Sequence, residues 1–334
     1  MIERVCIIGA GAWGTALAIV LRRAGRDVIM RARDAQVAAA IGERHENPLY
    51  LPDVHLDPAI EATTGLRRVA EADAVLLVTP AQAVRETMGE LAPHLAPSTP
   101  LVICAKGIEL GTGRLMGEVI EELRPGQVVA ALSGPTFAGE VARGLPTAVT
   151  VSCADPELGA ALVDAFGTAA FRPYYSADCI GTQIGGAVKN VVAIACGIVE
   201  GRGLGENARA ALMTRGLAEI TRFGMALGAE RRTLMGLSGL GDLVLTCSSR
   251  KSRNYDLGVE IGGGRTLEEL MASRRTVAEG VATAPAVLER ARDLGVDLPI
   301  CRAVAAILHE GADIATTIKK LLARRFRRED IVNH

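Results

Sequence analysis

Aromatic residues are scarce in this chain. They make up 3% of its 334 residues and include a single tryptophan, Trp13. Because hydrophobic residues still account for 49% of the chain, its core must consist mainly of alanine, valine, leucine and isoleucine. Such side chains suit a parallel sheet covered by helices, and the chain is long enough for two domains with a sizeable core.

The chain also lacks paired cysteines and clustered histidines. None of its seven cysteines belongs to a Cys-x-x-Cys pair, their number is odd, and several lie in apolar runs. This pattern indicates reduced core thiols in a cytosolic protein. The five histidines have no metal-ligand spacing and fit loop or surface positions better than catalysis. We therefore expect a cytoplasmic protein without a metal site.

An excess of charge and a long apolar run are missing as well. The formal net charge is −1, which gives no general attraction to nucleic acid. The uncharged stretch 5–21 holds three glycines and is shorter than the roughly 20 residues that span a bilayer, so we expect neither export nor stable membrane insertion. The basic segment 319–328 is typical of a solvated helix end, with an anionic membrane surface or an acidic partner as the alternative.

A glycine-rich motif lies almost at the N-terminus. The apolar run Arg4–Ile8 is typical of a buried strand, and Gly9, Gly11 and Gly14 then form G-x-G-x-x-G before a helix of small residues. Gly9 allows a tight turn, Gly11 lets the backbone approach a pyrophosphate, and Gly14 lets the helix pack close to the strand. The helix N-terminus attracts the phosphates. This order predicts a dinucleotide site, and the alternative is a glycine turn in some other α/β unit.

Strand and helix patterns alternate through the first half of the chain, which predicts a doubly wound parallel sheet. Its ligand should lie beyond the carboxyl ends of the strands. Segment 47–58 carries three prolines and is predicted to be a loop. The predicted strands are Arg4–Ile8, Asp27–Arg31, Ala74–Val78, Leu101–Cys104, Val128–Leu132, Ala148–Val151 and Phe171–Tyr174. Predicted helices between them include Gly14–Ala24, Ala35–Glu43, Ala81–Leu91 and Pro156–Phe166.

Strand patterns end near residue 178, and helical periodicity continues to the C-terminal end. We therefore predict an α/β protein with an N-terminal doubly wound Rossmann-like domain, residues 1–183, followed by an all-helical C-terminal domain, residues 184–334. The predicted helices of this part are Gln183–Val199, Ala208–Leu227, Thr233–Leu237, Asn254–Gly262, Thr266–Ser273, Ala284–Leu294 and Ile300–His309.

The end of the second predicted strand bears on the choice of cofactor. A carboxylate there binds the ribose 2′-hydroxyl of NAD, whereas an arginine accepts the 2′-phosphate of NADP. Arg33 could pair with that phosphate through two hydrogen bonds, and Asp34 follows it. The sequence favours NADP without excluding NAD. Alternatively, Arg31 and Arg33 are ordinary surface charges.

Two residues suit proton transfer to a secondary alcohol. Lys189 is a lone cation at the start of an apolar small-residue segment, Ala187–Ile198, where burial could lower its pKa enough for acid–base work. The alternative is a surface lysine at a helix start. Asp242 lies in a Gly-Leu-Gly-Asp turn that could present a carboxylate to a cleft, or it could cap a helix.

Five segments in order resemble NAD(P)-dependent sn-glycerol-3-phosphate dehydrogenase of the bacterial type. The resemblance covers essentially the whole chain, and five motifs in this order are highly specific. Besides the first glycine loop, the segments are KGIE at 106–109, SGPTFAGE at 133–140, AVKNVVA at 187–193 and GLGDLVLTC at 239–247, which continues to SRN at 252–254.

The resemblance implies an oxidoreductase that interconverts dihydroxyacetone phosphate and sn-glycerol 3-phosphate with NADPH or NADH. It also implies a homodimer and a role in supplying glycerol phosphate for phospholipid synthesis. Lys189 would be the catalytic proton donor and acceptor, and Asp242 would orient it. The implied substrate-binding residues are Lys106, Gly134, Thr136, Lys189, Asn190, Asp242, Thr246, Ser252, Arg253 and Asn254. The implied cofactor-binding residues are Gly9, Gly11, Ala12, Trp13, Gly14, Arg33, Lys106, Ala138, Arg253, Val277 and Glu279.

Phosphate binding and the reaction itself each leave alternatives open. Arg253 fits the need for a permanent cation, but the linker before it is rich in serine, arginine and lysine and departs from the commonest family pattern. Arg250 and Lys251 are therefore alternative phosphate ligands. A two-domain dehydrogenase acting on a 3-hydroxy acid or a phosphogluconate is a rival within the enzyme class. A nicotinamide-sensing protein without turnover is the rival outside it.

Overall fold

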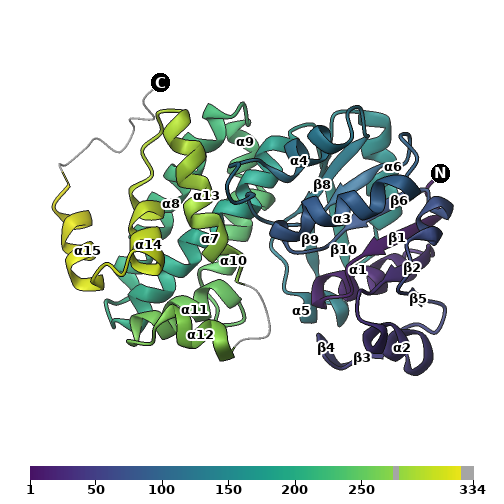
Figure 1. The fold of residues 1–334 in the computed structure, drawn as a ribbon, viewed down its shortest axis with the longest axis horizontal. Helices are drawn as coiled ribbons and strands as arrows, with labels where there is room; N and C mark the ends of the chain where they lie inside the picture. The colour runs from purple at the N-terminus through teal and green to yellow at the C-terminus, as the bar shows by residue number, and fades with distance from the viewer. Residues whose placement is uncertain (274–277, 325–334) are drawn as a thin grey trace.

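The computed structural model describes residues 1–273 and 278–324. Its N-terminal part is a sheet with helices on both faces, and its C-terminal part is a cluster of helices beside it (Figure 1). The predicted fold class is confirmed. The division after residue 183 stays a prediction, and that point lies inside helix α7 (Cys179–Gly201).

Eight strands form the sheet, in the order β10-β9-β8-β7-β6-β1-β2-β5. All neighbouring pairs are parallel except β8 and β9, which are antiparallel. The chain between these two strands holds only a five-residue helix, α5 (Ala138–Ala142), which is too short to return the chain along a strand as a parallel crossover requires. The strands are β1 (Arg4–Ile8), β2 (Asp27–Arg31), β5 (Glu61–Thr63), β6 (Ala74–Leu77), β7 (Leu101–Ile103), β8 (Val129–Ser133), β9 (Thr147–Cys153) and β10 (Phe171–Ser176).

The prediction of a loop at 47–58 is wrong. Two short strands, β3 (Glu46–Asn47) and β4 (Leu51–His55), form a separate antiparallel ribbon there. Pro52 lies within β4. A proline is tolerated in a two-stranded ribbon because each strand has an edge where no amide hydrogen bond is needed.

Side chains of the sheet belong to two hydrophobic cores, one on each face, because successive residues of a strand point to opposite faces. In β1, Val5 and Ile7 join the core beneath α1 (Ala12–Arg23). Cys6 and Ile8 join the other core, which holds Val84 and Val119 from the helices on that face. The other long helices around the sheet are α2 (Ala35–Arg44), α3 (Val84–Leu91), α4 (Met116–Leu123) and α6 (Pro156–Phe166).

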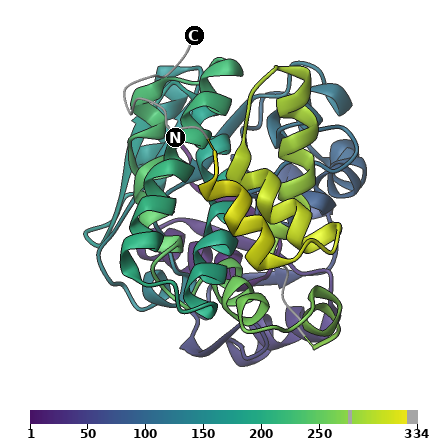
Figure 2. The same ribbon diagram turned by 90° about the vertical axis from the view of Figure 1, so that its left-hand side faces the viewer.

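The C-terminal part is built around α7, and no strand occurs in it among the described residues. Figure 2, in which this part faces the viewer, shows α14 and α15 in yellow at its outer side. The prediction missed α15 and placed the start of α13 at Ala284, five residues after its first residue, Glu279. The helices are α8 (Glu206–Ala226), α9 (Arg231–Leu234), α10 (Asp242–Thr246), α11 (Arg253–Gly262), α12 (Leu267–Ser273), α13 (Glu279–Asp293), α14 (Pro299–His309) and α15 (Ile314–Leu322).

Glycines bring α7 and α11 into unusually close contact. A Cβ at Gly197 would lie 2.0 Å from the carbonyl oxygen of Tyr255, and one at Gly258 would lie 2.1 Å from that of Ile194. Only glycine fits at such helix crossings. By length and composition α7 could cross a membrane, but 83% of its most apolar window is buried inside the protein, which is the pattern of a core helix.

Candidate active site

Lys189 lies in the middle of α7, at the junction of the two parts of the molecule. Lys189 lies at the start of the apolar segment Ala187–Ile198 but not of the helix, because α7 begins ten residues earlier at Cys179. Gly185 and Gly186, one turn before Lys189, are each packed too tightly for a Cβ: Gly185 against Ser238 and Gly186 against Ser133. These glycines therefore let α7 pack closely against Ser133 and Ser238.

The ammonium group of Lys189 is held by two buried partners. Its Nζ donates to Oδ1 of Asp242 and to Oγ1 of Thr246, each at 2.7 Å. The side chain of Lys189 is 8% exposed and that of Asp242 is 1% exposed. Asp242 begins α10 but makes no side-chain capping bond, so its carboxylate serves the lysine rather than the helix end.

A second lysine reaches the same carboxylate from the sheet. Lys106 follows β7, and its Nζ donates to Oδ2 of Asp242 at 2.7 Å and to the carbonyl oxygen of Gly134 at 3.1 Å. Asp242 thus bridges one ammonium group from each part of the molecule. Because an amine beside a carboxylate can hold or release a proton, this group of three is suited to acid–base chemistry on an oxygen atom.

The surroundings of Lys189 favour its neutral form more than those of an ordinary lysine. The pKa of Lys189 is lowered to about 8, chiefly by burial and also by the nearby charge of Lys106, while Asp242 opposes both effects. A lysine with this pKa exchanges its proton near neutral pH.

A glycine turn delivers Asp242 to this position. Residues Leu237–Gly241 form one wide helical turn directly before α10. A Cβ at Gly239 would lie 1.9 Å from the carbonyl oxygen of Leu234, so the turn can form only with glycine there. This turn places the carboxylate of Asp242 between Lys106 and Lys189.

Two of the predicted substrate ligands are already bonded to protein. The side-chain amide of Asn190 donates to the carbonyl oxygen of Lys106 at 3.1 Å, and its Oδ1 accepts from Asn254 at 3.0 Å. Oδ1 of Asn254 accepts from the backbone nitrogen of Gly280 at 2.9 Å. This series of hydrogen bonds links the segment after β7 to α7, α11 and α13. It therefore orders the site whether or not either amide contacts a substrate.

The turn before α11 holds the candidate phosphate ligands. Ser252 caps α11 by accepting a hydrogen bond from the backbone of Tyr255, and Arg253 is the first residue of the helix. Arg253 is solvent-exposed, yet desolvation by the surrounding protein lowers its pKa against the opposing charge of Glu279. A cation that lies in a concave part of the surface is expected to be both solvent-exposed and partly desolvated.

The two alternative phosphate ligands have ionic partners. Arg250 pairs with Glu200 and with Asp256, both in the helical part. Lys251 pairs with Glu140 of α5 at 2.7 Å. A phosphate bound by either residue would compete with these carboxylates.

The segment after β8 lines the opposite side of this junction. Gly134 has φ +154°, and a Cβ there would lie 2.9 Å from the Cα of Val149, so glycine is required. Thr136 donates its hydroxyl to the carbonyl oxygen of Gly134, and Ala138 begins α5.

The first glycine loop has the geometry that a pyrophosphate needs. Gly9 has φ +117°, and a Cβ at Gly14 would lie 2.0 Å from the carbonyl oxygen of Gly9. A Cβ at Gly11, in contrast, would meet no atom within 4 Å. The loop is thus tight on its inner side and open at Gly11, where a ligand can approach. Ala12 and Trp13 begin α1 directly after it.

Three of the predicted or neighbouring cofactor residues carry a buried polar atom without a partner among the described residues. Nε1 of Trp13, Oγ1 of Thr79 and Oε2 of Glu279 have no hydrogen-bond partner within the described ranges. Oε1 of Glu279 accepts from the backbone of Ala81 at 3.3 Å, so α13 reaches the end of β6. The residues therefore fit a bound dinucleotide. Val277, the other predicted cofactor contact from this region, lies outside the described residues.

Thr79 was missed by the sequence reasoning. It follows β6, one of the strands that flank the glycine loop in the sheet, and ligands of such sheets lie beyond these strand ends. Its position after this strand is the feature of the sequence that could have identified Thr79 as a candidate cofactor contact.

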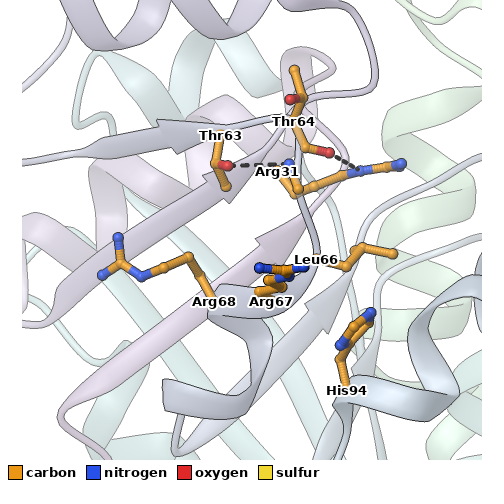
Figure 3. Close-up of a pocket in the computed structure, with 8 residues that line it drawn as sticks. Arg31, Thr63, Thr64, Leu66, Arg67, Arg68 and His94 are labelled. Atoms are coloured by element: carbon orange, nitrogen blue, oxygen red, sulfur yellow. Dashed lines mark hydrogen bonds between the residues drawn. The ribbon is translucent and has the colours of Figure 1, made fainter.

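The two arginines at the end of β2, Arg31 and Arg33, differ in their partners. Arg31 bonds the carbonyl oxygen of Thr64 at 3.3 Å and Oε2 of Glu90 at 3.2 Å, and it lines a pocket of about 590 Å³ with His94 and residues 63–68 (Figure 3). Arg33 is exposed, and no hydrogen bond or ion pair holds it within the part of the chain that the structure describes. Arg33 is therefore the residue free to meet a 2′-phosphate.

The fold and the site together define a nicotinamide-dependent dehydrogenase in which a Rossmann-like sheet and a helical part share one site. Residues 4–159 match the family model of the NAD-dependent glycerol-3-phosphate dehydrogenase N-terminus, and residues 178–319 match that of its C-terminus. The chain belongs to this family.

Relatives and solved structures agree over nearly the whole chain. Glycerol-3-phosphate dehydrogenase [NAD(P)+] of Parvibaculum lavamentivorans is 54% identical over 98% of both chains. That of Rhodospirillum rubrum is 55% identical over 98% of this chain and 95% of its own. The crystal structure of glycerol-3-phosphate dehydrogenase from Coxiella burnetii superposes with a TM-score of 0.92 at 36% identity, covering 96% of this chain and 99% of that one.

Proposed function

We propose that this protein interconverts dihydroxyacetone phosphate and sn-glycerol 3-phosphate by hydride transfer with NADPH or NADH. The observation that carries the proposal is the buried Lys189, bonded to Asp242 and placed where both parts of the molecule meet. Family membership supports the choice of substrate, because the relatives carry this activity in their names. The product would supply glycerol phosphate for phospholipid synthesis.

Lys189 moves the proton in this proposal. In the reducing direction its ammonium group donates a proton to the forming alkoxide, and in the oxidising direction the neutral amine takes the proton from the hydroxyl. Asp242 holds the Nζ in place and accepts a second bond from Lys106. Lys106 adds a positive charge that stabilises the developing alkoxide.

The substrate's phosphate and the cofactor bind to different segments. Arg253 binds the phosphate, with Ser252 and Asn254 beside it, and Gly134 and Thr136 meet the substrate from the sheet side. The cofactor lies along the glycine loop, with Ala138, Arg33, Val277 and Glu279 as further contacts. When bound, it supplies the hydride for the ketone carbon. Holding both reactants together is the main catalytic contribution of the chain.

The preference for NADPH follows from Arg33. An exposed arginine that has no partner among the described residues can form two hydrogen bonds to a 2′-phosphate, while Asp34 accepts a bond from the backbone of Gln36 as the cap of α2. NADH remains a substrate because every other cofactor contact is common to both nucleotides. A cytoplasmic location, a homodimer, and two domains divided near residue 183 complete the proposal.

The test is the loss of nicotinamide absorbance with purified protein, NADPH or NADH, and dihydroxyacetone phosphate. Substrate-dependent loss supports the proposal, and the ratio of the two rates measures the role of Arg33. A folded protein that binds the dinucleotide but consumes neither cofactor would overturn it in favour of a nucleotide sensor. Turnover with a 3-hydroxy acid or a phosphogluconate instead would identify the rival enzyme class.

A further inference from the structure

An ion pair joins the two parts of the molecule beside the proposed substrate site. Nζ of Lys251 lies 2.7 Å from Oε1 of Glu140 and 5.9 Å from the centre of the Phe137 ring. Lys251 belongs to the turn before α11, whereas Phe137 and Glu140 belong to the start of α5. One ammonium group is therefore held by both a carboxylate and an aromatic face of the opposite part.

Both partners sit next to residues of the proposed site. Lys251 precedes Arg253, the proposed phosphate ligand, by two residues, and Glu140 follows Ala138, a proposed cofactor contact, by two residues. Ser249 stiffens the turn of Lys251: its hydroxyl accepts from the Lys251 backbone at 3.2 Å. A shift of Lys251 would thus carry Arg253 with it.

This contact is more exposed than the tie between Lys106 and Asp242. The side chains of Lys106 and Asp242 are 16% and 1% exposed, whereas those of Lys251 and Glu140 are 61% and 33% exposed. A solvent-exposed ion pair contributes little stability and breaks easily, and a cation over an aromatic ring adds a modest amount at such a site. The exposed tie can therefore open and close more easily than the buried one.

We propose that Lys251 and Glu140 form a latch across the mouth of the substrate site. With the ion pair formed, the turn that carries Arg253 is held against α5. With it broken, the turn is released and ligands can enter or leave. Lys251 is a positioning residue, since it acts through Arg253. The inference rests on the function proposed above.

A double-mutant cycle on KM tests the latch. We expect Lys251→Ala and Glu140→Gln each to raise KM for dihydroxyacetone phosphate about two- to fivefold, the range that an exposed ion pair supports, with a smaller change in kcat. The double variant should match either single variant, because both changes remove the same contact. Lys251→Arg should restore a KM near that of the wild type, and high salt should abolish the differences.

Arg143→Ala is the matched control. Arg143 follows α5, is exposed, and donates to the carbonyl oxygen of Gly139 within its own segment. Its replacement removes the same charge from the same region without touching the latch, so KM should stay unchanged. Thermal midpoints of all variants check that the fold is intact.

Two results would overturn the latch. If Glu140→Gln left KM unchanged or lowered it while Lys251→Ala raised it, Lys251 would bind the phosphate itself. If neither variant changed KM in an active enzyme, the contact would have no role in ligand binding. A wild-type protein without any turnover would instead refute the proposed function, and the latch with it.

Discussion

The carboxylate of Asp242 faces two ammonium groups, and this arrangement sets how the site responds to pH. Lys106 and Lys189 repel each other, so the carboxylate between them is needed to keep both in place. Burial acts against the charge of Lys189, and its pKa falls to about 8. The proton that the reaction requires is therefore held weakly enough to be passed on.

The pH dependence of kcat/KM should reflect this group, because kcat/KM reports the ionisation of the free enzyme. Reduction needs protonated Lys189, so kcat/KM for ketone reduction should fall as pH rises through about 8. Oxidation needs the neutral amine, so its kcat/KM should rise over the same interval. Steady-state rates in both directions between pH 6 and 10 check this. Profiles of the same direction would contradict the assignment.

Replacement of Lys189 should separate binding from chemistry. Methionine keeps the length of the side chain but cannot carry a proton, so Lys189→Met should lower kcat by about a hundredfold or more, the scale of general acid–base catalysis. Its affinity for NADPH should stay near that of the wild type, since no cofactor contact is lost. Trp13 fluorescence during a cofactor titration measures this affinity. Retained turnover would remove Lys189 from its catalytic role.

Arg33 should decide between the two cofactors. Arg33→Ser removes the only side chain proposed to meet the 2′-phosphate, and a lost charge-assisted bidentate contact costs roughly 1.5–3 kcal/mol. KM for NADPH should rise about tenfold or more, while KM for NADH should change little. Arg31→Ser is the comparison, because Arg31 is engaged by Thr64 and Glu90. An equal loss with both cofactors would show that Arg33 acts on the fold instead.

At the scale of elements, Gly11 and Gly14 of the first glycine loop have different roles, and substitutions can distinguish these roles. Gly14→Ala places a Cβ 2.0 Å from the carbonyl oxygen of Gly9, so α1 must shift, and both stability and NADPH binding should fall. Gly11→Ala places its Cβ in open space. That variant should keep the wild-type thermal midpoint but bind NADPH at least tenfold more weakly. Equal destabilisation by the two changes would contradict this division of roles.

The first and last residues of a strand could be predicted from the sequence where an apolar run was uninterrupted. β1 and β2 begin and end at the predicted residues, because a strand buried on both faces leaves a continuous apolar run. The antiparallel direction of β9 was not readable. It depends on how a short connection packs against the rest of the fold, and a run of apolar residues carries no direction.

The residues of the site could be predicted from sequence motifs, but the contacts between them could not. Lys106, Lys189 and Asp242 were all predicted, yet the shared carboxylate depends on a helix and a turn that meet only in three dimensions. The bonds of Asn190 and Asn254 to protein were not foreseen for the same reason. The start of α7 was predicted at Gln183, four residues after its first residue, Cys179.

At the scale of the whole molecule, the proposed cofactor site draws on both parts of the chain. The glycine loop belongs to the sheet, whereas Glu279 reaches Ala81 from the helical part, and Lys106 is tied to Asp242. Binding of NADPH should therefore stabilise the two parts together. At a concentration of 100 times its Kd, a ligand adds about 2.7 kcal/mol to the free energy of unfolding.

That increment should raise the thermal midpoint by roughly 2 °C or more for a chain of this size, and unfolding should remain a single transition. Differential scanning calorimetry with and without NADPH measures both quantities. Lys189→Met should show the same rise as the wild type, and Gly11→Ala should show little, because only the second change obstructs the nucleotide. If the ligand instead split the transition, with one part stabilised and the other unchanged, the cofactor would contact the sheet alone. The proposed contact from α13 would then be wrong, and closure of the site would have to depend on the substrate.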